Sequence, residues 1–291
     1  VDYIYGQMRK ILTEAPVSYI KWDMNRAFSE VFSNGNDRTY QGKVRHNYIL
    51  GVYSLYERLI QEFPDVLFES CASGGARFDP GMLYYAPQAW TSDDTDAVER
   101  IKIQYGTSYV YPLSSMGSHV SASPNHQIFR STSLETRGNV AYFGTFGYEL
   151  DITKLTEKEL EQMKEQITFM KQHRDLIQKG EFYRLESPFK GNQAAWEVVA
   201  KDGSEGLMAY FRVRQPIQGK LERIYFSGLE ETKAYEVREC FGEKTDFGVH
   251  YGDELMYVGF SVSDCSSGLV GVARTGQGDG YSRLFHFRKV N

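Results

Sequence analysis

The chain has 291 residues, enough for one large domain or two domains of ordinary size. Its 41% apolar and 24% charged residues are the proportions of a globular protein, and its net charge of −5 argues against a surface for nucleic-acid phosphates. No apolar run approaches the roughly 18 residues of a membrane span. Three cysteines, Cys71, Cys240 and Cys265, are too few and too scattered for a disulfide framework or a metal site. We therefore expect no nucleic-acid or membrane partner. The expected location is the cytoplasm.

Apolar runs and helical periodicity alternate along the first 180 residues. The predicted strands are Val17–Asp23, Val66–Ser70, a strand that ends at Trp90-Thr91, Met116–Val120 and Phe146–Leu150. The predicted helices are Asp2–Glu14, His46–Phe63, Thr95–Ser108, Ser131–Tyr142 and a helix that starts at a capping box, Thr156-Glu157-Lys158-Glu159. A Gly/Pro loop is expected around Arg77-Phe78-Asp79-Pro80-Gly81.

Repeated strand–helix units with polar residues at the carboxyl ends of the strands are typical of a (β/α)₈ TIM barrel. Five strands are predicted, and eight are needed to close such a barrel. If the Thr156 helix is the eighth, Asp23 ends strand four and Asp93 ends strand six, so the chain carries about strands four to eight. An open doubly wound sheet needs only five strands, but no phosphate-binding loop follows any of them.

The pattern changes at about Glu181, where helical periodicity gives way to short alternating strands. They are predicted at Ala194–Ala200, Gly206–Arg212, Ile224–Phe226, Ala234–Arg238, Met256–Val258 and Ser282–Lys289, with a Gly/Ser-rich loop over Val262–Gly280. We therefore predict two domains. Residues 1–180 form the carboxyl-terminal part of the barrel, and residues 181–291 form an antiparallel all-β, sandwich-like domain.

An unusual mixture of side chains lies at the end of the first predicted strand, where Lys21, Trp22, Asp23 and Asn25 fall within five residues. A carbohydrate site uses such a mixture: an aromatic face for a sugar ring, a carboxylate for the anomeric carbon, and Lys and Asn donors for hydroxyls. Since side chains alternate along a strand, Lys21 points to the same side as Asp23 and favours its charged form. The structural alternative is a simple Lys–Asp pair at a strand end.

The second carboxylate is Asp93, which lies seventy residues after Asp23 in the sequence (93 − 23). It follows the predicted strand that contains Trp90. Two aspartates at the ends of different strands suggest glycoside hydrolysis by a carboxylate pair. The neighbours Asp94 and Asp96 compete with Asp93 for this role, and the run Asp93-Asp94-Thr95-Asp96 also looks like a helix N-cap. Spacing alone does not choose among the three.

A general acid must keep its proton near neutral pH, so the acid of this pair needs apolar surroundings that raise its pKa. Trp90 and the pair Tyr84-Tyr85 are the candidates for such surroundings. Glycines after Cys71 would allow a close approach of the backbone to a ligand, although such clusters are most often turns. Cys71 has no histidine nearby in motif form, which argues against a cysteine nucleophile.

Three segments carry a resemblance to a known family: KWDMNR, SCASGGARFDPGMLYYAPQAWTSDDTDA and IQYGTSYVYPLSSMGSHVSASPNHQ. Over about residues 1–180 the chain resembles the retaining α-galactosidases of glycoside hydrolase family 36. The resemblance implies that Asp23 is the nucleophile and Asp93 the general acid/base. It also places Cys71 and Gly74 at the galactose. One departure concerns Ser73, which stands where the family usually has a glycine.

The resemblance implies hydrolysis of terminal α-galactosyl residues in oligosaccharides of the melibiose and raffinose type, without a cofactor. The expected substrate-binding residues are Lys21, Trp22, Asn25, Cys71, Gly74 and Trp90. It further implies a homo-oligomer, a tetramer in the family, and additional barrel sequence before this chain, so that the chain alone would be incomplete. The alternatives are a galactosyl transferase of the same superfamily and a non-catalytic carbohydrate-binding protein on a barrel scaffold.

Overall fold

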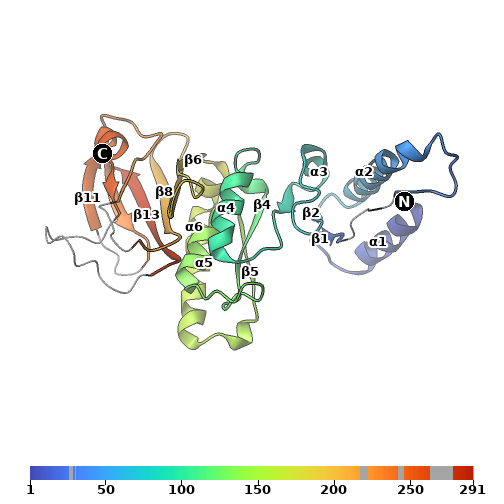
Figure 1. Cartoon of the computed structure of the whole chain (residues 1–291), viewed down its shortest axis with the longest axis horizontal. Coiled ribbons are helices and arrows are strands. Elements are labelled where there is room, and N and C mark those ends of the chain that lie inside the picture. Colours follow the sequence, from blue (N-terminus) through green and yellow to red (C-terminus); the bar gives the residue numbers. More distant parts are fainter. Residues whose placement is uncertain (26–28, 30, 217–221, 242–245, 263–277, 291) are drawn as a thin grey trace. The chain divides into compact units, whose positions relative to one another are not determined.

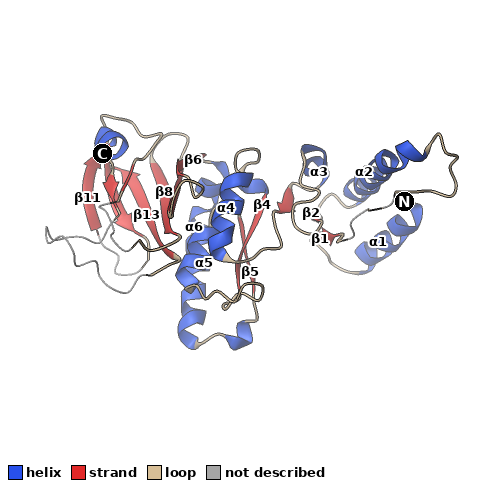
Figure 2. Ribbon diagram, in the orientation of Figure 1, coloured by secondary structure: helices blue, strands red, loops and turns tan. Residues whose placement is uncertain are grey.

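The computed structural model of the chain describes residues 1–25, 29, 31–216, 222–241, 246–262 and 278–290. The chain forms two compact units, Val1–Asp93 and Asp94–Asn291. Figure 1 shows the course of the chain and Figure 2 its helices and strands. Each unit is described by itself.

The first unit contains three parallel strands and the helices between them. Its elements are α1 (Asp2–Glu14), β1 (Tyr19–Asp23), a 3₁₀ turn (Gln41–Lys43), α2 (Val44–Glu62), β2 (Leu67–Cys71), α3 (Pro80–Tyr85) and β3 (Gln88–Trp90). The strand β1 pairs with β2, and β2 pairs with β3. The helix α3 occupies the end of the predicted Gly/Pro loop, which corrects that prediction: Pro80 stands at the first helical position and Asp79 caps it by accepting from the Met82 N–H.

The strands of this unit have an apolar face and a polar face. Trp22 of β1 and Phe68 of β2 pack against α2, where the Trp22 ring lies 4.9 Å from the Tyr56 ring between centroids. Because side chains alternate along a strand, Lys21 and Asp23 lie on the opposite face. Helix α2 therefore covers the apolar face, and the other face carries the polar strand ends.

The α/β part of the second unit holds the parallel pair of β4 and β5. Its elements are α4 (Ala97–Thr107), a 3₁₀ turn (Leu113–Ser115), β4 (Met116–Ser121), α5 (Leu134–Ala141), β5 (Thr145–Glu149), a 3₁₀ turn (Ile152–Lys154) and α6 (Glu157–Lys179). The capping box predicted at Thr156 is present: its hydroxyl accepts from the Glu159 N–H, and the Glu159 carboxylate accepts from the Thr156 N–H.

All five strands predicted for the first 180 residues are present, and their order in the parallel sheet is β1-β2-β3-β4-β5. Consecutive strands of a (β/α)₈ barrel follow one another in this way. A doubly wound sheet instead reverses its strand order at a switch point. The strand order therefore favours the half-barrel over the open sheet.

The pattern changes to antiparallel strands directly after α6, at Gly180, as predicted from the loss of helical periodicity. A six-stranded sheet has the order β11-β10-β13-β8-β7-β6, and a two-stranded sheet pairs β12 with β9. The bounds are β6 (Glu181–Glu186), β7 (Gln193–Val199), β8 (Glu205–Arg212), β9 (Arg223–Ile224), β10 (Ala234–Glu239), β11 (Asp246–Tyr251), β12 (Phe260–Ser261) and β13 (Tyr281–Lys289). Strands β6, β11 and β12 were not predicted. Most of the predicted loop Val262–Gly280 lies outside the described residues.

One predicted strand, Met256–Val258, is wrong: these residues belong to a π-helix, Glu254–Val258. The apolar residues Leu255, Met256 and Val258 suit a strand, but the flanking residues decide the local structure. The Asp253 carboxylate accepts from the Glu254 N–H at the start, and Gly259, with φ 84°, allows the turn that ends it.

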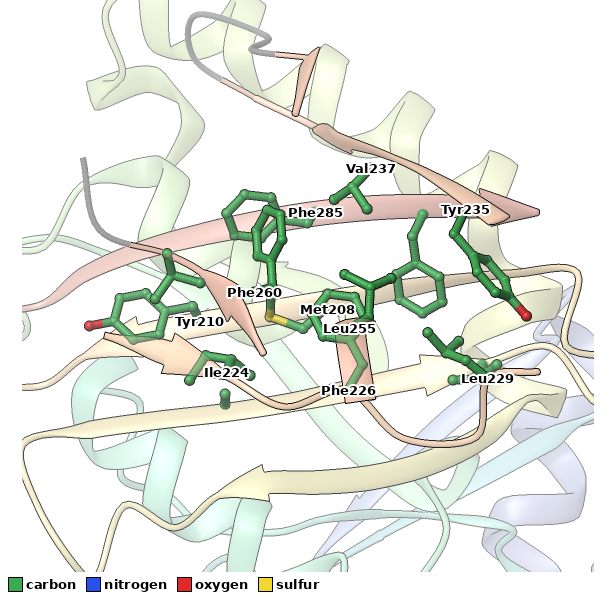
Figure 3. Packing of buried hydrophobic residues seen from close by; sticks show 14 residues of the cluster. Met208, Tyr210, Ile224, Phe226, Leu229, Tyr235, Val237, Leu255, Phe260 and Phe285 are labelled. Carbon is green, nitrogen blue, oxygen red and sulfur yellow. The ribbon is translucent and has the colours of Figure 1, made fainter. Parts of the chain in front are cut away.

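The core of the all-β part lies between these two sheets. Figure 3 shows Met208 and Phe285 of the six-stranded sheet meeting Leu255 of the π-helix and Phe260 of β12. The buried cluster consists of Ala195, Val199, Met208, Tyr210, Ile224, Phe226, Leu229, Tyr235, Val237, Leu255, Phe260, Val262, Phe285 and Phe287. The antiparallel strands agree with the all-β fold class that was expected for this part of the chain. None of the helices in the described part of the chain has the length and apolar content needed to cross a membrane.

A fully buried carboxyl group in this all-β part leads to a stability prediction. Glu197 of β7 accepts one hydrogen bond, from the Ser227 N–H at 2.5 Å. Burial raises the pKa of Glu197 well above its ordinary value, against the smaller opposing effect of that bond. The folded state thus favours the protonated acid. Stability is greatest below the pKa of the unfolded chain and falls as the pH rises toward the folded pKa.

We therefore expect Glu197→Gln, which keeps the acceptor but does not ionise, to raise the Tm more at pH 8 than at pH 5. Each kcal/mol corresponds to about 2–4 °C in a chain of this size class. Calorimetry across this pH range measures the effect. Glu197→Ala, which leaves the Ser227 N–H without its acceptor, should lower the Tm at every pH. A Tm gain for Glu197→Gln that is independent of pH would contradict the prediction.

Candidate active site

The candidate site lies in the first unit, where β1 and β2 end side by side. Asp23 pairs in register with Cys71, and the Met24 N–H extends the ladder by donating to the Cys71 carbonyl at 3.1 Å. Lys21 and Asp23 are both exposed on the polar face of the sheet. The strand ends thus present a carboxylate and an ammonium on one side, as predicted.

A hydrogen-bonded chain connects the loop after β2 to the Asp23 carboxylate. The Ser73 N–H donates to Asn25 Oδ1 at 2.9 Å, and Asn25 Nδ2 donates to Asp23 Oδ2 at 2.9 Å. A backbone N–H can only donate, so it must face the amide oxygen of Asn25. The amide nitrogen of Asn25 is thereby directed at Asp23.

These surroundings stabilise the ionised form of Asp23. Burial raises the pKa of the Asp23 carboxyl, but four other interactions outweigh burial and hold this pKa below its ordinary value. They are hydrogen bonds from the Asn25 amide, the Cys71 thiol and the Met24 N–H, and the charge of Lys21. Asp23 is therefore a carboxylate at neutral pH, as a nucleophile must be.

Cys71 serves as a donor in this arrangement. Its side chain is buried, and burial raises the pKa of the thiol to about 11, so the thiol stays protonated at neutral pH. This agrees with the expectation that Cys71 is not a nucleophile. Arg77, which was expected only as part of a loop, donates through its guanidinium to the Cys71 carbonyl at 2.7 Å. The position of Arg77 in the loop directly after β2 could have indicated a role at the site.

Gly74 brings the loop after β2 against the end of β3. Its φ is 78°, and a Cβ at this position would lie 2.7 Å from Ser92 Cα and 2.9 Å from Asp93 N. Any side chain would therefore collide with the backbone of Ser92 and Asp93. The predicted contact of Gly74 with a sugar stays a prediction, but the close packing already requires glycine here. Ser73 beside it has φ 49°, a left-handed conformation that is uncommon outside glycine.

The three clustered aspartates have different surroundings. Asp96 is buried and caps α4 by accepting from the Val98 and Glu99 N–H groups, and Asp94 accepts from the Asp96 N–H at 3.0 Å. The N-cap alternative is thus confirmed for Asp96, with Asp94 supporting the turn. Asp93 is exposed, which leaves it accessible to a ligand.

The apolar surroundings expected for Asp93 stay a prediction, although the two tyrosines expected there have other contacts. Tyr84 is 74% exposed, and the Tyr85 ring lies 5.2 Å from that of Tyr53, among the residues that pack against α2. The pair was expected at Asp93 because it is close in sequence. The short helix α3 instead directs Tyr85 toward α2.

The two tryptophans expected to contact a sugar are placed differently. Trp22 lies in the apolar cluster on the face opposite Asp23, so we leave it out of the site proposed below. Trp90 is only 3% exposed, and the Lys21 ammonium lies 4.4 Å from its ring centroid. Both sugar contacts stay predictions.

No group of three or more His, Cys, Asp or Glu side chains within the described ranges is placed to hold a metal ion. The predicted chemistry with two carboxylates stays a prediction. Asp23 is held ionised next to a cation, and Asp93 is exposed at the end of β3, a neighbour of β2 in the sheet.

The link between Asn25 and Asp23 can be tested without any assay of activity. Asn25→Asp should raise the pKa of the Asp23 carboxyl, because a donated hydrogen bond is replaced by a like charge. Asn25→Ala removes the donor without adding a charge, so the rise should be smaller. Carboxyl ¹³C NMR titration measures both, with Asp23→Asn to assign the signal. An unchanged or lower pKa in Asn25→Asp would show that Asn25 does not donate to Asp23.

Two family models match the chain. The model described as Melibiase matches residues 1–180, and the model of the glycosyl hydrolase family 36 C-terminal domain matches residues 193–287. The α-galactosidase AgaA of Geobacillus stearothermophilus is 52% identical over 269 residues, which is 92% of this chain and 36% of that protein. Mel36A of Lactobacillus acidophilus is 42% identical over 293 residues, or 100% of this chain and 37% of that protein.

Solved structures agree with this family resemblance. A variant of AgaA in complex with raffinose matches with a TM-score of 0.90 and 49% identity, over 99% of this chain and 38% of that one. The α-galactosidase of Lactobacillus brevis matches with a TM-score of 0.91 and 47% identity, over 100% of this chain and 38% of that one. The predicted fold class is thereby confirmed. The chain spans a little over a third of the length of these relatives.

Proposed function

Since the chain belongs to the Melibiase family, we propose that it is the part of a retaining α-galactosidase that carries both catalytic carboxylates. One observation supports this most directly: the Asn25 amide donates to the Asp23 carboxylate at the end of β1, where the charge of Lys21 also favours the ionised form. A carboxylate poised in this way suits attack on an anomeric carbon.

In the first step, an Asp23 oxygen forms a bond to the anomeric carbon while the bond to the leaving oxygen breaks. The hydrogen bonds from Asn25 and Cys71 hold the carboxylate in one orientation during this attack. The product is a galactosyl ester of Asp23 with inverted configuration. Lys21 and Asn25 have further N–H groups that can bind sugar hydroxyls.

Asp93 gives its proton to the leaving oxygen in the first step. In the second step, the Asp93 carboxylate takes a proton from water, and the water oxygen attacks the anomeric carbon and releases Asp23. Two inversions restore the original configuration. The exposure of Asp93 supports this exchange with water and leaving group. The reaction needs only the two carboxylates and water.

The spacing of two aspartates in AgaA supports the same pair. One AgaA variant that replaces an aspartate was solved with raffinose and another with stachyose. The replaced aspartates are at positions 548 and 478 of that protein, which are 70 residues apart, the same separation as Asp93 and Asp23 (93 − 23). We propose oligosaccharides with a terminal α-galactosyl residue, such as raffinose and melibiose, as the substrates.

We further propose that the protein is a cytoplasmic homo-oligomer whose catalytic barrel ends near residue 180. Cys71 and Cys240 are free thiols in the described part, which suits a reducing compartment. The change from helix α6 to strand β6 at Gly180 supports the domain boundary. Light scattering of the purified protein would measure its oligomeric state.

The test is hydrolysis of melibiose, raffinose and an aryl α-galactoside, followed by NMR of the first product. Because five strands do not close an eight-stranded barrel, the assay uses the protein that carries this chain. We expect α-galactose to appear before the β-anomer. The β-anomer first would indicate inversion and contradict the retaining mechanism. Transfer to an added sugar that exceeds hydrolysis would identify a galactosyl transferase instead.

A further inference from the structure

Trp90 was expected to stack against a sugar ring, but its position in the structure does not suit that role. Its side chain is only 3% exposed, so a sugar ring has no open indole face to stack on. Stacking requires the ring of a ligand to cover the aromatic face. The group that lies over this ring is the Lys21 ammonium, 4.4 Å from its centroid.

The register of the sheet explains how the two side chains meet. Lys21 pairs with Glu69, and Glu69 pairs with Gln88, so these three side chains point to the same face. Trp90 follows Gln88 by two residues and therefore lies on that face as well. Asp23 follows Lys21 by two residues and shares it too.

We propose that Trp90 is a positioning residue: its indole face holds the Lys21 ammonium on the side of β1 that carries Asp23. Lys21 is exposed, and a free lysine side chain loses rotamer entropy when it is fixed. A rigid, buried aromatic face offsets this cost through the attraction between the cation and the ring. Lys21 is thereby preset near the carboxylate whose ionised form it favours.

The kinetic test of this inference rests on the proposed function, because it needs α-galactosidase activity. Trp90→Leu should lower kcat/KM on an aryl α-galactoside by about 2- to 30-fold, the range that corresponds to a cation–π contact. Trp90→Phe keeps an aromatic face and should lose less. In a Lys21→Met background the same Trp90→Leu change should have an effect of less than about 2-fold, because the contact is already gone.

A matched control separates positioning from general packing. Phe68 is a buried aromatic residue on the opposite face of the sheet, so Phe68→Leu removes a ring without touching Lys21. The effect of Phe68→Leu on kcat/KM should add to that of Lys21→Met. The Tm loss of Phe68→Leu shows what a cavity alone costs, for comparison with Trp90→Leu. If Trp90→Leu does not fold, Trp90→Met replaces it, since methionine fills more of the space and still has no ring.

A second readout does not depend on activity. The pKa of the Asp23 carboxyl, measured by ¹³C NMR, should rise in Trp90→Leu as it does in Lys21→Met, and should not rise further in the double variant. This pattern in a protein without α-galactosidase activity would reject the proposed function and support the positioning role. Additive effects on both the pKa and kcat/KM would overturn it and leave Trp90 a packing residue.

Discussion

Replacing Asp23 by Asn is expected to lower kcat/KM by about 10⁴- to 10⁶-fold, because the nucleophile is lost while the side-chain volume is kept. The fold should be retained, since Asp23 is exposed at a strand end. Circular dichroism and the Tm check this. Activity within about 10-fold of the parent protein would exclude Asp23 as the nucleophile.

Chemical rescue makes the assignment more specific. Asp23→Gly opens space where a small anion such as azide or formate can attack the anomeric carbon in place of the carboxylate. A single displacement by azide should give the β-galactosyl azide, with inverted configuration. A variant that lacks the acid/base carboxylate should instead yield a product of retained configuration. The configuration of the azide product therefore distinguishes the two roles.

Local rules were enough to predict much of the first unit. The helix Asp2–Glu14 has the same bounds in the structure as in the prediction, and the strand that ends at Asp23 ends there in both. The alternation that placed Lys21 beside Asp23 also places Trp22 on the opposite face. The sequence thus contained the information that Trp22 faces the core, although its place in a polar run suggested a sugar contact.

Contacts between distant segments were harder to predict. The pairing of Lys21 with Trp90 depends on the register of three strands, and no local pattern specifies that register. The donor that orients Asn25 is the backbone of Ser73, and a backbone group leaves no trace in the residue types. The surroundings of Asp93 likewise depend on where α3 directs its tyrosines. These features follow from packing within the first unit rather than from any single segment.

The two carboxylates are placed in contrasting ways. Asp23 is held by side chains and backbone groups from two strands, whereas Asp93 is exposed at the end of β3 with its backbone against Gly74. A nucleophile must keep one orientation and one charge state. A general acid/base must exchange its proton with a leaving group and then with water. The fixed carboxylate thus suits the first role and the accessible one suits the second.

Replacing Asp93 by Asn is expected to produce a loss that depends on the leaving group. With melibiose or raffinose, whose leaving sugars need a proton, kcat/KM should fall by about 10²- to 10⁴-fold. With an activated aryl α-galactoside the first step needs little protonation, so galactosyl-enzyme should still form and a burst of aryl product should appear. Steady-state rates on a series of aryl galactosides with different leaving-group pKa values measure this dependence.

Asp94→Asn is the matched control, since Asp94 is the adjacent carboxylate and its side chain accepts from the Asp96 N–H. An asparagine can keep that acceptor, so Asp94→Asn should affect all leaving groups equally and only slightly. Azide should restore turnover of the aryl substrate by Asp93→Asn and yield the α-galactosyl azide, because it attacks the ester on Asp23. A leaving-group dependence in Asp94→Asn that is absent from Asp93→Asn would transfer the acid/base role to Asp94.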